Sequence, residues 1–190
     1  EDQPRFLSRI HQEADRLVAL INDILRLSQL DEGGALPHEQ VSVLELAQEA
    51  ARSLTAQAAA QAVHISVTGT VGTVFGVRRL LYEIARNLCE NAVKYNVPGG
   101  SVTVEVAETD RDVALLVRDT GIGIPEGDQS RVFERFYRVD KSHSRAIGGT
   151  GLGLSIVKHA VAYHHGTLRL ESQLGKGTVI TVTLPKKPTE

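Results

Sequence analysis

The chain has 190 residues, of which 42% are hydrophobic and 23% are charged, and its formal net charge at pH 7 is −2. This length allows one full domain and an additional element, and the near-neutral charge argues against a basic surface that binds nucleic acid. The single cysteine, Cys89, excludes an internal disulfide framework, and no apolar run approaches the roughly 20 residues that span a bilayer. We therefore expect a cytoplasmic fragment, without membrane contact, of a longer protein. Whether that longer protein is anchored in the cell membrane stays open.

Residues 6–30 carry the apolar spacing of a long helix. Apolar side chains recur at alternating intervals of three and four, at Leu7, Ile10, Ala14, Leu17, Ile21 and Ile24. This pattern predicts a coiled-coil-type helix, whose broad apolar face needs a partner, either an omitted helix or a second copy of the chain. Two glycines at positions 33 and 34 end the helix, and we expect a hinge at residues 31–40.

The rest of the chain combines short strands and helices without a strict βαβ order. Alternating hydrophobicity and turn residues predict strands at 63–69, 73–76, 101–109, 112–119, 166–173 and 177–185. Helices are predicted at 43–60, 77–95 and 151–165, and Cys89 lies among apolar neighbours, as a buried structural thiol would. The stretch at 121–149 is long for a loop, which favours a functional role. Together these elements predict an α+β two-layer sandwich.

A carboxylate followed by alternate glycines ends the strand predicted at 112–119. In DTGIGIP, at residues 119–125, the missing side chains of Gly121 and Gly123 let a flat ligand approach the backbone. Asp119 would accept a hydrogen bond from the exocyclic amine of adenine, whereas guanine presents an oxygen there. Losing a hydrogen bond to a charged group costs about 1.5–3 kcal/mol, which is enough to select ATP over GTP. The same residues occur in ordinary turns, so the motif alone leaves both interpretations open.

A second glycine-rich segment, GGTGLGLSIVKHA at residues 148–160, leads into an amphipathic helix. Free backbone N–H groups and the positive end of the helix dipole would face outward there, which suits an anion. The segment lacks the Gly-Lys-Ser/Thr ending of a P-loop and the layout of a dinucleotide-binding fold. A flexible connector with a glycine cap is the alternative interpretation.

Two asparagines stand in the helix predicted at 77–95, although asparagine is a poor helix former. Asn87 and Asn91 are one turn apart on one face, with Lys94 on the same face and Tyr95 after it. Amide oxygens are neutral ligands that suit Mg²⁺, and they avoid the repulsion of roughly 4 kcal/mol that a carboxylate about 4 Å from a phosphate charge would add. Lys94 would add a cation, and Tyr95 a ring beside a base. A solvated polar face is the alternative if the glycine motifs are ignored.

In this order the motifs resemble the catalytic, ATP-binding domain of sensor histidine kinases, a member of the GHKL superfamily with the Bergerat fold. NLCENAVKY resembles the N box, DTGIGIP the first glycine box, VFERFYR the F box and GTGLGLSIV the second glycine box. The resemblance implies a catalytic ATP-binding domain at residues 40–186. Residues 1–32 resemble the second helix of the dimerisation and histidine-phosphotransfer hairpin, without the helix that carries the acceptor histidine.

The resemblance also implies roles for individual residues. Mg²⁺ would be bound by Asn87 and Asn91, and the catalytic residues would be Asn87, Asn91, Lys94 and Arg138. The nucleotide would be contacted by Asn91, Lys94, Tyr95, Asp119, Gly121, Gly123, Ile124, Lys141, Gly149, Thr150, Gly151, Leu152 and Gly153. Residues 125–149 would form a lid over ATP, anchored by Phe133 and Phe136, with Arg135, Arg138 and Lys141 as candidate phosphate contacts.

These roles predict a kinase core that transfers the γ-phosphoryl group of ATP to a histidine on an omitted upstream helix, for relay to an aspartate of a response-regulator receiver domain. The full-length protein would be a homodimer through the hairpin. Members of the superfamily that hydrolyse ATP carry glutamate at the position of Asn87, as the base that activates water. An amide cannot take up a proton, and Glu90 would point off that face, so transfer to a protein is favoured over hydrolysis.

No acceptor sequence surrounds His11 or the six other histidines, so we expect that the fragment does not phosphorylate itself. His164 and His165 lack a zinc-binding arrangement and are predicted to cap the last turn of their helix. Two alternatives stay open. One is a nucleotide-sensing interaction module of the same fold without catalysis. The other is a serine kinase like the anti-sigma-factor kinases of the same superfamily, which the hairpin-like first helix disfavours.

Overall fold

The computed structural model describes residues 36–139 and 150–187, together with residues 14, 17, 18 and 21. Those four residues are helical, and their side chains are exposed. The remainder of the predicted first helix, His11, Lys141 and Gly149 lie outside the described residues. Within the described ranges, no helix combines the length and the apolar character needed to cross a membrane.

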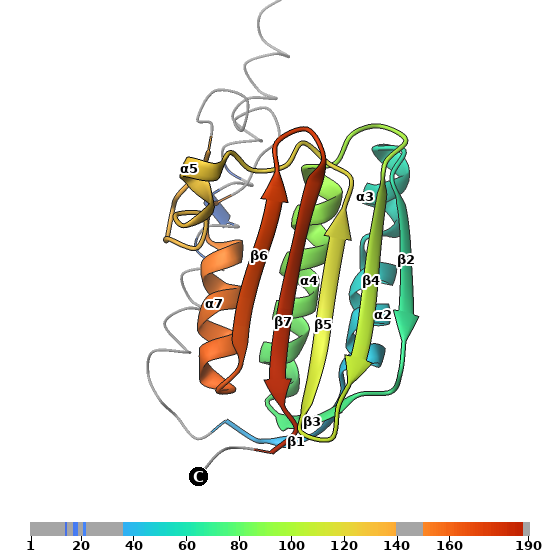
Figure 1. Cartoon of the computed structure of the whole chain (residues 1–190), viewed down its shortest axis with the longest axis vertical. Helices are drawn as coiled ribbons and strands as arrows, with labels where there is room; N and C mark the ends of the chain where they lie inside the picture. Colours follow the sequence, from blue (N-terminus) through green and yellow to red (C-terminus); the bar gives the residue numbers. More distant parts are fainter. Residues whose placement is uncertain (1–13, 15–16, 19–20, 22–35, 140–149, 188–190) are drawn as a thin grey trace, which may run out of the picture.

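A five-stranded sheet forms one layer of the molecule (Figure 1). Its strands are β2 (His64–Gly69), β4 (Ser101–Glu108), β5 (Asp112–Asp119), β6 (Thr167–Gln173) and β7 (Gly177–Pro185). They lie in the order β2-β4-β5-β7-β6, with β2 parallel to β4 and the other neighbours antiparallel. Alternate residues of the central strands are buried, such as Val102, Val104 and Val106 of β4, because successive side chains point to opposite faces.

Helices cover one face of this sheet and form the second layer (Figure 1). They are α2 (Val43–Ser53), α4 (Arg78–Lys94) and α7 (Gly153–Tyr163), and the short α3 (Thr55–Ala60) follows α2. The central helix, α4, contacts both α2 and α7. It buries Leu80, Ile84 and Leu88 in the shared core. The predicted α+β two-layer sandwich is therefore confirmed.

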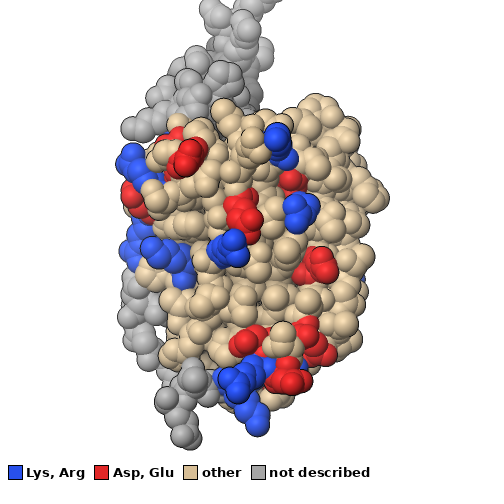
Figure 2. Space-filling view, viewed as in Figure 1, with Lys and Arg blue, Asp and Glu red and all other residues tan. Residues whose placement is uncertain are grey.

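The other face of the sheet is open, and Figure 2 shows acidic and basic side chains interspersed on it among uncharged residues. Cys89 belongs to the opposite, helix-covered side, where it is fully buried in the core. Burial raises the pKa of its thiol to about 12. This confirms the prediction of a structural cysteine, because a thiol that stays protonated is a poor nucleophile.

A second, two-stranded sheet pairs β1 (Glu39–Ser42) with β3 (Thr73–Gly76) in antiparallel orientation. β3 was predicted, whereas β1 was not, and β1 begins inside the hinge predicted at 31–40. That prediction is wrong at positions 39 and 40. Val41 pairs in register with Val74, and both side chains are buried, so the segment after the first helix is fixed to the core.

The helix predicted at 43–60 is interrupted at Leu54, where the backbone leaves the helical region (φ −100°, ψ 1°). The hydroxyl of Ser53 donates to the carbonyl three residues earlier, and the hydroxyl of Thr55 does the same, at 2.7 and 2.9 Å. Such side-chain bonds compete with the backbone bonds that would continue the helix. The predicted loop at 121–149 also contains a short helix, α5 (Glu126–Gln129).

His164 caps α7 and connects it to the start of α4. Its Nδ1 donates to the carbonyl of Ala160 at 2.7 Å, and its Nε2 accepts the backbone N–H of Val77 at 3.0 Å. This pattern requires the neutral ring, because a protonated ring has no accepting nitrogen. Burial lowers the pKa of His164, against a smaller opposing effect of the bond to Ala160. The predicted capping role is confirmed for His164.

Candidate functional site

Asn87 and Asn91 lie on the face of α4 that meets the start of α7. A Cβ atom added at Gly153, the first residue of α7, would stand 2.9 Å from Oδ1 of Asn87 and 3.8 Å from Nδ2 of Asn91. The second glycine segment and the two asparagines, far apart in the sequence, therefore form one group. A side chain at Gly153 would crowd the amide oxygen, so the position needs glycine for close approach.

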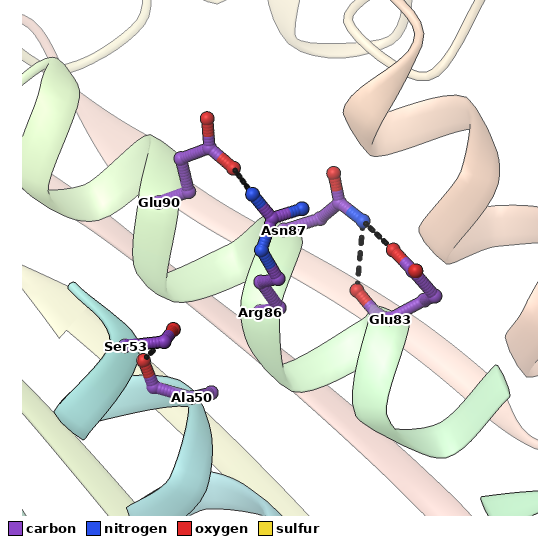
Figure 3. Close-up of polar contacts among 6 residues, drawn as sticks. All are labelled: Ala50, Ser53, Glu83, Arg86, Asn87 and Glu90. Atoms are coloured by element: carbon purple, nitrogen blue, oxygen red, sulfur yellow. Dashed lines mark hydrogen bonds and ion pairs between the residues drawn. The ribbon is translucent and has the colours of Figure 1, made fainter. Parts of the chain in front are cut away.

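The amide of Asn87 is buried and is held by a residue one turn earlier (Figure 3). Its Nδ2 donates to the backbone carbonyl of Glu83 at 2.8 Å and to Oε2 of the same residue at 3.3 Å. Glu90 instead pairs with Arg86 at 3.3 Å. The expectation that Glu90 points off the asparagine face stays a prediction.

The segment that leads into α7 presents backbone groups, and no side chain of a described residue caps the helix. The N–H of Leu152 donates to Oγ1 of Thr150 at 3.2 Å, and the carbonyl of Gly151 accepts the N–H of Phe136 at 2.9 Å. Leu152 is fully buried, so the predicted contact of this residue with the nucleotide stays a prediction. The uncapped N–H groups and the positive end of the helix dipole suit an anion.

Asp119 ends β5, and the protein binds one of its two carboxylate oxygens. Oδ1 accepts the N–H groups of Gly121 at 2.8 Å and of Thr178 at 3.2 Å. No described residue donates a hydrogen bond to Oδ2. Burial raises the pKa of Asp119, and the two backbone hydrogen bonds act in the opposite direction. The carboxylate is therefore fixed in orientation and keeps one oxygen that can accept a donor such as an amine.

The loop after Asp119 packs against the C-terminal end of α4. A Cβ atom added at Gly121 would stand 2.2 Å from the carbonyl oxygen of Tyr95, and the N–H of Ile122 donates to that carbonyl at 3.0 Å. Only a residue without a side chain permits this approach. As a result, the loop of Asp119 adjoins the same helix that carries the two asparagines.

Lys94, Tyr95 and Arg138 form a partly buried group at this end of α4. Nζ of Lys94 lies 5.6 Å from the centroid of the Tyr95 ring. Burial lowers the pKa of Lys94; Glu90 opposes this effect and Arg138 adds to it. Burial raises the pKa of Tyr95, and the charge of Arg138 lowers it. The charge of Arg138 thus acts on both residues, and the role that the resemblance implied for Arg138 stays a prediction.

The loop that follows Asp119 is held in place by polar residues that the sequence motifs did not indicate. Oγ of Ser172 accepts the N–H of Ile124 at 2.8 Å. Nε2 of Gln129 donates to the carbonyls of Ile124 and Ser172 at 3.0 and 2.9 Å. Thr178 completes the set through its bond to Asp119. Three of these contacts join residues 43 to 59 positions apart, so no local pattern could reveal them. The only nearby signal is the turn that precedes Thr178.

Some residues that were predicted to contact the nucleotide or to anchor the lid make other contacts in the structure. Arg135 lies against α7, with its Nη2 3.2 Å from Nε2 of His159. Phe133 is half-buried, but Phe136 is 57% exposed and has a positive φ of 64°. The expectation that both rings anchor the lid is therefore wrong for Phe136, whose backbone N–H makes the contact instead. Gly123 lies against the β6–β7 turn, where a Cβ atom would stand 2.1 Å from the carbonyl oxygen of Gln173.

The donor set suits a hard cation that is bound together with a ligand. The described residues contain no group of three or more His, Cys, Asp or Glu side chains that could hold a metal ion. Mg²⁺ commonly takes only one or two protein ligands and completes its octahedron with water and substrate phosphates. Oδ1 of Asn87 faces Gly153 at the start of α7, whose first turn has no side-chain cap. The residues present therefore fit Mg²⁺ carried with phosphates.

Two family models match the sequence. The family described as "Histidine kinase-, DNA gyrase B-, and HSP90-like ATPase" matches residues 76–188, and the "His Kinase A (phospho-acceptor) domain" matches residues 1–33. The "Sensor-like histidine kinase SenX3" of Mycolicibacterium smegmatis is 40% identical over 188 residues, which cover 97% of this chain and 48% of that protein. The "Sensor histidine kinase WalK" of Bacillus subtilis is 34% identical over 197 residues, covering 97% of this chain and 31% of that protein. The chain thus spans about half or less of the length of these curated relatives.

Solved structures share the fold. The "Mycobacterial sensor histidine kinase MprB" matches with a TM-score of 0.70 and 32% identity, over 80% of this chain and 100% of that chain. Full-length ShkA, in complex with AMPPNP, matches with a TM-score of 0.81 and 25% identity, over 100% of this chain and 40% of that chain. Each similarity covers most or all of the present chain.

Proposed function

Because the chain belongs to the family of histidine kinase-, DNA gyrase B- and HSP90-like ATPases, we propose that it is the ATP-binding kinase core of a two-component sensor histidine kinase. The core would transfer the γ-phosphoryl group of ATP to a histidine of the phosphotransfer hairpin, from which a response-regulator aspartate would take it. We assign residues 40–186 to the catalytic domain and residues 1–32 to one helix of the hairpin. The match of residues 1–33 to the His Kinase A domain supports this division and a homodimer of the full-length protein.

One observation carries the proposal: α4 contacts both glycine segments. Its residue Asn87 stands against Gly153 at the start of α7, and Tyr95, which directly follows the helix, accepts a hydrogen bond from the loop of Asp119. A ligand on this helix can therefore be recognised at one end by a carboxylate and at the other by amides and backbone N–H groups. This arrangement suits a molecule with a flat amine-bearing base and a polyphosphate, namely ATP.

We assign a separate task to each part of the site. Asp119 would accept the exocyclic amine of adenine through Oδ2, since Oδ1 is already occupied. Backbone N–H groups at the start of α7 would bind phosphate oxygens, and Lys94 and Arg138 would add positive charge. Asn87 and Asn91 would hold Mg²⁺, which supplies charge neutralisation at the phosphates when bound. The AMPPNP bound to the related ShkA supports nucleotide binding.

The residue at position 87 favours transfer to a protein over hydrolysis. An amide cannot act as the base that removes a proton from water, and Nδ2 of Asn87 is already engaged with Glu83. The neighbouring carboxylate of Glu90 is paired with Arg86. The carboxylate on the asparagine face, that of Glu83, is buried and accepts a hydrogen bond from Asn87, which is compatible with a kinase whose acceptor histidine brings its own nucleophile.

The proposal is tested by measuring phosphoryl transfer from ATP to a separately produced hairpin. The chain is incubated with [γ-³²P]ATP, Mg²⁺ and a separately produced hairpin that carries the acceptor histidine. We expect acid-labile label on the hairpin, as for a phosphohistidine, and no label on the chain itself. Binding of AMPPNP without any transfer would instead support the alternative, a nucleotide-sensing module without catalysis. Acid-stable label would point to serine phosphorylation and contradict the proposal.

A further inference from the structure

Glu83 is a buried carboxylate for which the proposed chemistry has no role. It lies on α4 one turn before Asn87, and only 8% of the residue is exposed. Burying a carboxylate is costly unless it is well hydrogen-bonded. Its position places Glu83, Asn87 and Asn91 in a row, each one turn from the next, along the face that meets α7.

The contact between Glu83 and Asn87 fixes the direction of the amide (Figure 3). Both atoms of Glu83 that face the amide, the backbone oxygen and Oε2, are hydrogen-bond acceptors, at 2.8 and 3.3 Å from Nδ2. If the amide were rotated by half a turn, its oxygen would face two acceptors and both bonds would be lost. The NH₂ group must therefore point to Glu83, and Oδ1 must point away from it.

The direction that results is the one the metal site requires. Oδ1 of Asn87 is the atom that a Cβ at Gly153 would meet at 2.9 Å, so the oxygen faces the start of α7. Asn91 lacks an equivalent orienting bond from any described residue. Glu83 therefore acts on one of the two amides, the one that is more deeply buried.

From this geometry we infer that Glu83 is a positioning residue for the metal: it holds the amide of Asn87 so that the oxygen, and not the NH₂ group, faces the bound cation. The inference rests on the proposed function of the site. Groups that orient metal ligands in this way typically change metal affinity by about 10- to 100-fold when they are replaced.

Three variants on the same helix test the inference. Glu83→Leu removes the side-chain acceptor at 3.3 Å and leaves the backbone acceptor at 2.8 Å, whereas Glu83→Gln keeps both acceptors. Glu90→Leu is the matched control, because Glu90 pairs with Arg86 and not with Asn87. The Mg²⁺ dependence of ADP binding is measured by calorimetry. We expect Glu83→Leu to raise the Mg²⁺ concentration at half-saturation by about tenfold or more. Glu83→Gln and Glu90→Leu should stay within about threefold of the wild type. ADP affinity in excess chelator should be equal in all four proteins, which a general loss of structure would not allow.

A second readout needs neither metal nor nucleotide. In the metal-free protein, the side-chain NH₂ signals of Asn87, identified by their loss in Asn87→Ala, should exchange slowly with solvent in the wild type and in Glu83→Gln. Fast exchange in the folded wild type would overturn the inference, even if Glu83→Leu failed to fold. An unchanged Mg²⁺ dependence in Glu83→Leu would overturn it as well, and so would a further loss when Glu83→Leu is added to Asn87→Ala.

These outcomes are separable from failure of the proposed function. If ADP binding by the wild type did not depend on Mg²⁺, the proposed metal site would be wrong, and the inference that depends on it would be rejected with it. If the wild type depends on Mg²⁺ and Glu83→Leu does so equally, the site stands and only the positioning role of Glu83 is rejected.

Discussion

Replacing Asp119 by asparagine should weaken ATP binding without unfolding the protein. The amide oxygen of the new side chain can accept the same two N–H groups, from Gly121 and Thr178, that now bind Oδ1. Its NH₂ group then takes the place of Oδ2 and faces the amine of adenine, so that two donors meet. The loss of a hydrogen bond to a charged group, about 1.5–3 kcal/mol, corresponds to roughly 10- to 150-fold weaker binding.

Stability should not fall in this variant. Burial raises the pKa of Asp119, so the ionised carboxylate destabilises the fold at neutral pH, and this cost is relieved only when the pH falls through the raised pKa. An uncharged side chain of the same shape removes that cost. We therefore expect a Tm equal to or above that of the wild type. The change in ATP affinity can then be ascribed to recognition.

The assay is calorimetric titration with AMPPNP, with the exposed Asp110→Asn as the matched control. Asp119→Asn should bind at least tenfold more weakly, and the control should bind like the wild type. The preference for adenine over guanine nucleotides should also shrink, because the new NH₂ group can donate to the guanine oxygen. Affinity within about threefold of the wild type, together with an unchanged preference for adenine, would refute the assignment of Asp119.

Three further results are expected. Gly153→Ala places a Cβ atom 2.9 Å from Oδ1 of Asn87, an amide that is held by its bonds to Glu83. Mg²⁺-dependent ADP affinity measured by calorimetry should therefore fall about tenfold. The pKa of His164 is lowered from 6.5 by burial, so the unfolded state takes up the proton first and the free energy of unfolding should decrease as the pH falls below 6.5. Denaturant titrations at several pH values should show this slope in the wild type and in the exposed-site control His64→Gln, and a smaller slope in His164→Gln. The Cys89 thiol, with a pKa of about 12, should not react with a disulfide reagent at pH 8 until the protein unfolds, and rapid reaction of the native protein would contradict its burial.

The sandwich and the site motifs could be predicted because their signals are local. Alternation in β4 and β5 and the helical spacing around Asn87 and Asn91 depend on residues only a few positions apart. The glycines were also informative, because Gly121 and Gly153 lie where their backbone closely approaches another segment of the chain. The interruption at Leu54 was missed because helix propensity is nearly continuous there and a few side-chain bonds decide the outcome.

Features that depend on distant partners could not be predicted in the same way. β1 forms because Val41 pairs with Val74 in the core, and the sequence of a four-residue strand does not by itself predict that pairing. The hydrogen bond between Thr178 and Asp119 spans 59 positions. Glu83 is different: it is one turn from Asn87, so the spacing was visible, but only the distances show that its carboxylate faces the amide. Sequence periodicity gives the face of a helix, and the direction of a side chain on that face depends on its neighbours.

The composition of α4 argues that a ligand on its α7 side has shaped the sequence. Asparagine is less favourable than alanine in a helix by up to about 0.7 kcal/mol, and a buried carboxylate adds a desolvation cost. Glu83 and Asn87 reduce each other's cost through their hydrogen bonds, whereas Asn91 has no side-chain hydrogen bond to a described residue. Opposite them, Gly153 forgoes helix propensity at the start of α7. Stability alone would favour apolar residues and alanine at all four positions, as α4 has on its core face. Four local costs at one contact are therefore best explained by a function located there.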